Sequence, residues 1–162
     1  MTSKKSHIFA EQITLFHNVK GWYPPVSEVV KGLTAEQAKW KEGVNHSIWE
    51  LLAHLTFWNE RWLKRFLAES VDQLETNEAT FFKENADRGD EQSWADLIEH
   101  FDHVMNAWRK ELLACEDAKM DEALSFDPNS NWWEALSCLT THNTYHLGQM
   151  IMIRKQQNSW NP

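Results

Sequence analysis

Residues 131–156, "NWWEALSCLTTHNTYHLGQMIMIRKQ", decide the fold class of this chain. Asn131 and Glu134 have the three-residue spacing of a helix N-cap and its partner. Beyond them, one set of side chains recurs at three- and four-residue intervals: Leu136, Leu139, His142, His146, Met150 and Ile153. Residues at these intervals share one face of a helix. The stretch therefore predicts a long amphipathic helix, with two histidines four residues apart on its interior face.

The same periodicity predicts three further helices, at about 5–20, 47–68 and 93–112. Their apolar faces carry Phe9, Ile13, Phe16 and Val19; Leu51, Leu55, Trp58 and Trp62; and Trp94, Leu97, Phe101, Val104, Trp108 and Leu112. The prolines of "GWYPP" (21–25) end the first helix, and Ser47 and Glu50 form a capping box that opens the second. Thr34 and Gln37 have the same spacing, so a short turn of helix is expected within 33–40.

Strand signals are nearly absent, and segments 69–92 and 116–130 are polar, so we expect long irregular connections there. The chain has 162 residues, and ten tryptophans against five glycines and four prolines, which indicates few turns and long packed elements. Its length is that of one domain, residues 1–162. The predicted fold class is all-α, most simply a four-helix bundle.

The charge and the apolar pattern exclude several classes of protein. A net charge of −8 without a basic stripe argues against nucleic-acid binding. No stretch has the apolar length of a membrane span, and residues 1–16 lack the apolar run of a signal peptide. Cys115 and Cys138 form no CxxC motif, so we expect reduced thiols in a cytoplasmic protein, with a sulfur metal ligand as the weaker alternative.

The position of each histidine relative to the apolar faces separates interior from surface rings. His54 lies between Leu51 and Trp58 on the second helix, so it is expected to face the core together with His142 and His146. Eight histidines placed at random would give about 0.4 pairs at four-residue spacing, so the spacing alone does not establish a site. The other rings are expected outside the core: His100 and His103 on a solvated edge, His7 and His17 at the surface, and His46 over the open end of the bundle, where it could support the ligands or contact a substrate.

Two interpretations of the three interior histidines remain open at this point. Each could be a separate core residue that is hydrogen-bonded to a neighbour. Alternatively, one metal ion could bind all three, since each buried imidazole needs partners for two ring nitrogens and an ion satisfies one nitrogen on every ring. Two ligands one helical turn apart and a third from a facing helix are a suitable arrangement for such an ion.

"HSIWELLAHLTFW" (46–58), followed by "HNTYHLGQM" (142–150), resembles the DinB-like (DinB/YfiT-type) family of proposed metal-dependent enzymes. The resemblance spans nearly the whole chain, and "GWYPP" loosely matches a tryptophan-containing turn near the pocket of relatives. It implies an up-down-down-up four-helix bundle, a homodimer, and a divalent metal held at His54, His142 and His146. Some relatives look like hydrolases, and others are S-transferases or isomerases that use a small thiol.

Three neutral imidazoles leave an ion its full charge and an open coordination position, as in catalytic sites. Zinc or nickel is expected, with iron or manganese as alternatives. A hydrolase would use metal-bound water with a pKa of about 7, and an S-transferase would use a bound small-molecule thiol. The third hypothesis is a non-catalytic metal-binding or dimerisation module, in which His46 or Glu50 would supply a fourth ligand.

The remaining candidate residues each have a functional and a structural interpretation. Glu50 is a candidate general base by spacing, or only the partner of Ser47 in its capping box. Tyr145 could line the pocket of a small-molecule substrate or donate a hydrogen bond. Asn143 and Gln149 could orient the imidazoles or join helices. Four aromatic residues could wall the pocket or belong to the core: Trp22, Tyr23, Trp49 and Trp58.

Overall fold

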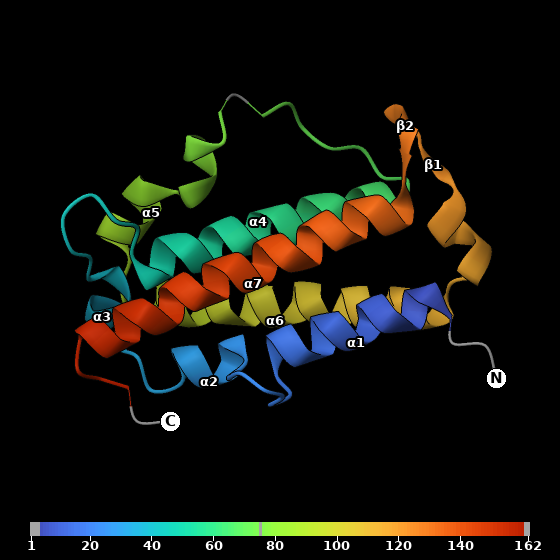
Figure 1. Ribbon diagram of the computed structural model, residues 1–162. Helices are drawn as coiled ribbons and strands as arrows, with labels where there is room; N and C mark the ends of the chain where they lie inside the picture. The colour runs from blue at the N-terminus through green and yellow to red at the C-terminus, as the bar shows by residue number, and fades with distance from the viewer. Residues whose placement is uncertain (1–3, 75, 161–162) are drawn as a thin grey trace.

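Four long helices dominate the computed structural model, which describes residues 4–74 and 76–160 (Figure 1). They are α1 (Lys5–His17), α4 (Ile48–Phe66), α6 (Glu91–Ala114) and α7 (Trp132–Gln156). Helices α1 and α4 each pack against both α6 and α7. The protein is mostly helical, which confirms the all-α fold class.

Capping boxes open three of the helices where the sequence predicts them. The hydroxyl of Ser47 accepts the Glu50 backbone N–H at the start of α4, and Asn131 does the same for Glu134 at α7. The short helix α3 (Ala35–Lys39) begins at the predicted Thr34 box. Helix α6 starts slightly earlier than expected, because the cap is Asp90.

The end of α1 differs from the prediction of a helix that reaches Lys20. The helix ends at His17, because the backbone of Asn18 leaves the helical region at φ −148°. Val19, predicted to face the core, is therefore exposed. The chain then passes Pro24 and Pro25 into α2 (Val26–Val30), which packs against α7.

The predicted irregular connections both contain regular structure. Segment 69–92 includes η1 (Glu78–Phe81) and α5 (Lys83–Arg88), which pack against α4. Segment 116–130 includes η2 (Asp117–Asp121) and most of an antiparallel hairpin of β1 (Ala123–Leu124) and β2 (Asp127–Asn131). Isolated buried side chains fix these short elements to the helices: Thr80, Phe81, Ala86, Met120 and Leu124.

The core lies between the four long helices and is rich in aromatic residues. Trp108 is fully buried, and its indole N–H donates to the backbone carbonyl of Asn59 at 2.8 Å. His17, predicted to lie at the surface, is also buried: its ring packs edge-on against Phe101 and its Nε2 lies 2.7 Å from Asp102. Across the described ranges, none of the helices has the combination of length and apolar character needed to cross a membrane.

Candidate metal centre

Three imidazoles meet where α4 faces α7. His54 comes from α4, and His142 and His146 come from successive turns of α7. The Nε2 atom of His142 lies 3.1 Å from Nε2 of His54 and 3.1 Å from Nε2 of His146. Within residues 4–74 and 76–160, these three side chains are the one group of three or more histidine, cysteine or acidic residues close enough to share an ion.

The tautomer of His54 follows from a hydrogen-bond chain on its other nitrogen. Nδ1 of His54 lies 2.6 Å from Oγ1 of Thr80, and the Thr80 hydroxyl donates to the carbonyl of Asn77 at 2.6 Å. Because the one hydroxyl proton is used at Asn77, Thr80 accepts the Nδ1–H of His54. A neutral His54 then presents an unprotonated Nε2 to the other two rings.

The tautomer of His146 is set in the same way by the helix turn beyond it. Its Nδ1 lies 2.6 Å from Oε1 of Gln149, an atom that can only accept. The amide of Gln149 keeps this orientation because its NH₂ group donates to the Tyr145 hydroxyl at 3.4 Å. His146 therefore also presents an unprotonated Nε2 toward His142.

A count of protons shows that the three rings cannot satisfy one another. Two lone pairs, on His54 and His146, point toward Nε2 of His142, which carries one proton at most when the ring is neutral. Since His54 and His146 are buried, a lone pair left without a donor there is costly. A cation between the three nitrogens would satisfy all three lone pairs at once.

Burial keeps the rings uncharged and suited to bind a cation. Burial, followed by the charges of His146 and His142, lowers the pKa of His54 to about 3. Burial and His146 lower the pKa of His142 to about 4, and burial also lowers the pKa of His146. All three are therefore neutral ligands at physiological pH.

The spacing of the nitrogens fits one ion of the kind that imidazole prefers. Nitrogens held about 2.0–2.1 Å from a common ion, at angles of about 90–110°, are separated by about 2.8–3.4 Å. The two separations of 3.1 Å lie within this range. The residues present therefore fit a divalent ion held by three histidines.

Phe81 of η1 closes one side of the site. Its ring stacks on His54 with centroids 4.0 Å apart, and on His46 at 3.6 Å, so the phenyl ring lies against both imidazoles. Sequence reasoning missed both Thr80 and Phe81, since segment 69–92 shows no helical period. The adjacent threonine and phenylalanines in this otherwise polar segment were the only signal.

Glu50 is buried, and both of its oxygens have partners. Oε1 pairs with Lys41, and Oε2 lies 2.9 Å from Nδ1 of His46 and accepts the Ser47 backbone N–H. Burial raises the pKa of Glu50, but the hydrogen bonds from Lys41 and His46 together lower it by more. The net shift of the pKa is therefore downward. Glu50 completes the capping box and holds His46, while neither residue belongs to the group of converging ligands.

The other candidate residues lie at different distances from the histidines. Asn143 is buried and exchanges two amide hydrogen bonds with Asn59, so it joins α7 to α4. Tyr145 is exposed, with its ring edge-on to His146. Trp22, expected to wall the pocket, is fully exposed, and Tyr23 lines a separate surface cavity of about 410 Å³ that Tyr145 shares.

Two cavities open beside the histidines. One of about 280 Å³ is lined by His142 and by apolar side chains that include Trp58 and Trp62, with the free thiol of Cys138 at its edge. The second, of about 440 Å³, is lined by His46, Tyr145 and Gln149 among others. Trp49 instead packs on Trp94, away from the two cavities.

Comparison with known protein families gives a match. The family model described as the DinB superfamily matches residues 25–150, which include all three converging histidines. No curated protein and no solved structure matches the chain significantly.

Proposed function

The chain belongs to the DinB superfamily, and we propose that within this family it is a divalent-metal-dependent enzyme that acts on a small molecule. The observation that carries the proposal is the convergence of three Nε2 atoms whose lone pairs have too few protons to satisfy them. His54, His142 and His146 would hold the ion, with zinc or nickel preferred by their imidazole nitrogens. A bound ion would act as a Lewis acid that lowers the pKa of a thiol or of water and so provides a nucleophile.

The fold that we propose for the family member is an up-down-down-up four-helix bundle. In support, Figure 1 shows α1 and α7 running in one direction and α4 and α6 in the opposite one. The pairs α1 with α7 and α4 with α6 are also in contact. In this arrangement, α4 supplies one of the proposed metal ligands and α7, which faces it, supplies the other two.

Transfer of a small-molecule thiol is the reaction that we rank first. The cavity beside His142 has mainly apolar walls, formed by Trp58, Trp62 and Leu139, and is suited to an apolar electrophile. Thiols are acidic enough to lose their proton to a neighbouring imidazole. His46 lines the opposite cavity, and Glu50 accepts its Nδ1–H, so its Nε2 is left to receive that proton.

Hydrolysis is the second candidate, and the same pair of residues favours it. A histidine whose Nδ1–H is held by a buried carboxylate is a common general base. His46 and Glu50 have this arrangement at 2.9 Å, and His46 is partly exposed to the cavity where a water molecule could enter. Gln149, Thr80 and Phe81 would fix the ligand rings in either reaction.

Metal analysis followed by activity screening tests the proposal. The purified protein should contain about one equivalent of zinc or nickel, while His142→Ala and His146→Ala should contain only traces and keep their helical far-UV signal. His103→Ala, an exposed histidine of α6, is the matched control and should keep the metal. Full occupancy in the first two variants would exclude the assignment.

Two screens then separate the reactions: a panel of thiols with an apolar electrophile, and a panel of esters and amides. His46→Gln should reduce turnover while the metal content stays unchanged, since His46 is outside the converging group. Metal-loaded protein that is inactive in both screens would favour the non-catalytic metal-binding module instead.

We also propose that the protein is a cytoplasmic homodimer, as the family resemblance and the tryptophan content suggest. Light scattering at working concentration should give twice the chain mass of 19.1 kDa. A monomer mass would reject the dimer without affecting the metal proposal.

A further inference from the structure

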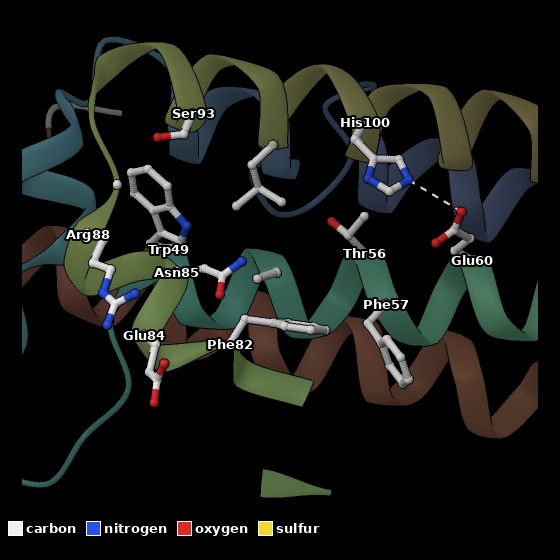
Figure 2. A pocket seen from close by; sticks show the side chains of 13 residues that line it. Trp49, Thr56, Phe57, Glu60, Phe82, Glu84, Asn85, Arg88, Ser93 and His100 are labelled. Atoms are coloured by element: carbon white, nitrogen blue, oxygen red, sulfur yellow. Dashed lines mark ion pairs between the residues drawn. The ribbon is translucent and has the colours of Figure 1, made fainter. Parts of the chain in front are cut away.

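A further cavity, of about 510 Å³, lies beside α4 and has none of the three converging histidines in its lining. Figure 2 shows it between α4, α5 and the first turns of α6. Its volume is in the range of small-molecule sites, which are mostly apolar with a few polar groups. The apolar walls are Trp49, Phe57, Phe82 and Leu97. The proposed metal centre therefore does not use this cavity.

Local packing and backbone geometry fix two of the aromatic walls, Trp49 and Phe82. Trp49 is buried and packs so closely under Gly89 that a Cβ there would lie 2.3 Å from its ring. Phe82 joins η1 to α5 with its backbone in the left-handed region, at φ 46° and ψ 46°. A bulky residue rarely adopts this conformation, and such strain is typical of functional sites. The two adjacent rings take different directions: Phe82 lines the cavity, whereas Phe81 stacks on His54.

The charges at the two ends of the cavity differ. At one end, Glu60 lies within 3.4 Å of both His100 and Lys64, so its charge is already balanced. At the other end, α5 presents Glu84 and Arg88, which are exposed and lie one helical turn apart (Figure 2). Neither forms an ion pair with any side chain in the described part of the chain. This end therefore offers both an anion and a cation to a ligand.

We propose that this cavity binds a free aromatic α-amino acid. The ligand carboxylate would pair with the guanidinium of Arg88, and its ammonium group with the carboxylate of Glu84. The ring would lie between Trp49 and Phe82, where aromatic surfaces stack favourably. A ligand with one charge would form only one of these two ion pairs, so a zwitterion should bind more tightly than either singly charged analogue.

Calorimetry with three ligands that each carry one phenyl ring tests whether the cavity prefers a zwitterion. L-phenylalanine should bind about fivefold more tightly than 3-phenylpropionate, which lacks the ammonium group, and than phenethylamine, which lacks the carboxylate. Equal binding of the three, or no binding of L-phenylalanine up to about 10 mM, would overturn the proposal.

Two variants assign the charges to residues. Arg88→Gln should weaken L-phenylalanine and 3-phenylpropionate by about fivefold or more and leave phenethylamine unchanged, and Glu84→Gln should do the reverse. Both side chains are exposed, so the fold should persist, as circular dichroism would verify. Arg109→Gln and Glu99→Gln, exposed on α6, control for net charge. Binding that survives both cavity variants would reject the placement, whereas His142→Ala should bind the amino acid normally.

Discussion

Ala68 follows Leu67, the C-cap residue of α4, and its backbone is in the left-handed region, at φ 59°. The N–H of Glu69 donates to the carbonyl of Lys64 at 2.8 Å, and the N–H of Ala68 donates to Arg65 at 3.1 Å. These two bonds define a Schellman motif, in which glycine is the usual residue at this position. Alanine is disfavoured there, because its Cβ crowds the backbone.

Ala68→Gly should therefore raise the free energy of unfolding by about 0.5–1 kcal/mol, after the greater flexibility of glycine in the unfolded chain is counted. Urea titration would measure the change. Asn158 has the same place after α7, at φ 52°, but asparagine tolerates this region. Asn158→Gly should thus give a smaller gain, and a larger one would contradict the explanation.

Thr80 is the residue that sets the orientation of His54. Thr80→Val keeps the shape of the side chain but removes the oxygen that accepts Nδ1–H at 2.6 Å. Loss of such a partner typically weakens metal binding by about 10–100-fold, which chelator competition would measure. Thr80→Ser should restore most of the affinity. Thr144→Val removes a hydroxyl that donates to the carbonyl of Thr140 in its own helix, and it should not change the affinity.

At the scale of elements, the long helices could be predicted because their apolar residues repeat over many turns. The capping boxes at Ser47 and Asn131 predicted where α4 and α7 begin to within one residue. The same repeat placed His54, His142 and His146 on faces where their rings come together. Periodicity of this kind is a local property, so it can be read from a single sequence.

The short elements could not be predicted, since a single turn has no period. Helix η1 is four residues long, and the bond from His54 to Thr80 spans 26 positions. His17 was misplaced for a similar reason: its partner Asp102 lies 85 positions away on α6. Partners that the tertiary structure supplies leave no local pattern in the sequence. Of the two hydrogen bonds that set the tautomers of His54 and His146, the bond to Thr80 is of this kind, whereas the bond to Gln149 is local.

The link between α4 and α7 beside the histidines is a buried pair of amides. Asn143 and Asn59 exchange hydrogen bonds at 2.8 and 2.9 Å, and both are fully buried. Asn143→Leu should lower the free energy of unfolding by about 1–3 kcal/mol, because Oδ1 of Asn59 is left without a donor.

Replacing both residues tests whether the loss comes from the unpaired amide. The double variant Asn59→Leu/Asn143→Leu removes the donor and the acceptor together, so it should recover much of the loss in Asn143→Leu. Urea titrations of the two single variants and the double variant complete the cycle. Losses that simply add would indicate that the two amides do not depend on each other.

For the whole molecule, the converging histidines make the stability of the metal-free protein depend on pH. The folded pKa values of His54 and His142 are about 3 and about 4, because burial disfavours their charged forms. In the unfolded chain the same rings titrate near about 6.5. Below that pH the unfolded chain binds protons that the folded protein does not, so stability falls as the pH decreases. Above about pH 7 the rings are neutral in both states and contribute no slope.

Glu50 also makes the stability of the metal-free protein fall at acid pH. Its folded pKa is lowered, so its contribution is present above its unfolded value and is lost as the pH falls through the folded pKa. The histidines act first, since their unfolded pKa is higher. Between about pH 6.5 and pH 5, the metal-free protein should therefore lose about 3 kcal/mol from the two histidines, before the carboxylate of Glu50 contributes.

Urea titrations of chelator-treated protein at a series of pH values measure this slope. His54→Gln/His142→Gln should flatten the curve between about pH 6.5 and pH 5, because the groups that take up protons on unfolding are gone. His103→Gln, an exposed ring on α6, should leave the slope unchanged. Saturating zinc should raise the whole curve, because the ion binds the folded state and competes with protons for the same nitrogens. A metal-free protein whose stability is constant from pH 7 to pH 5 would mean that these rings already take up protons in the folded state, and a charged triad could not serve as a set of neutral ligands.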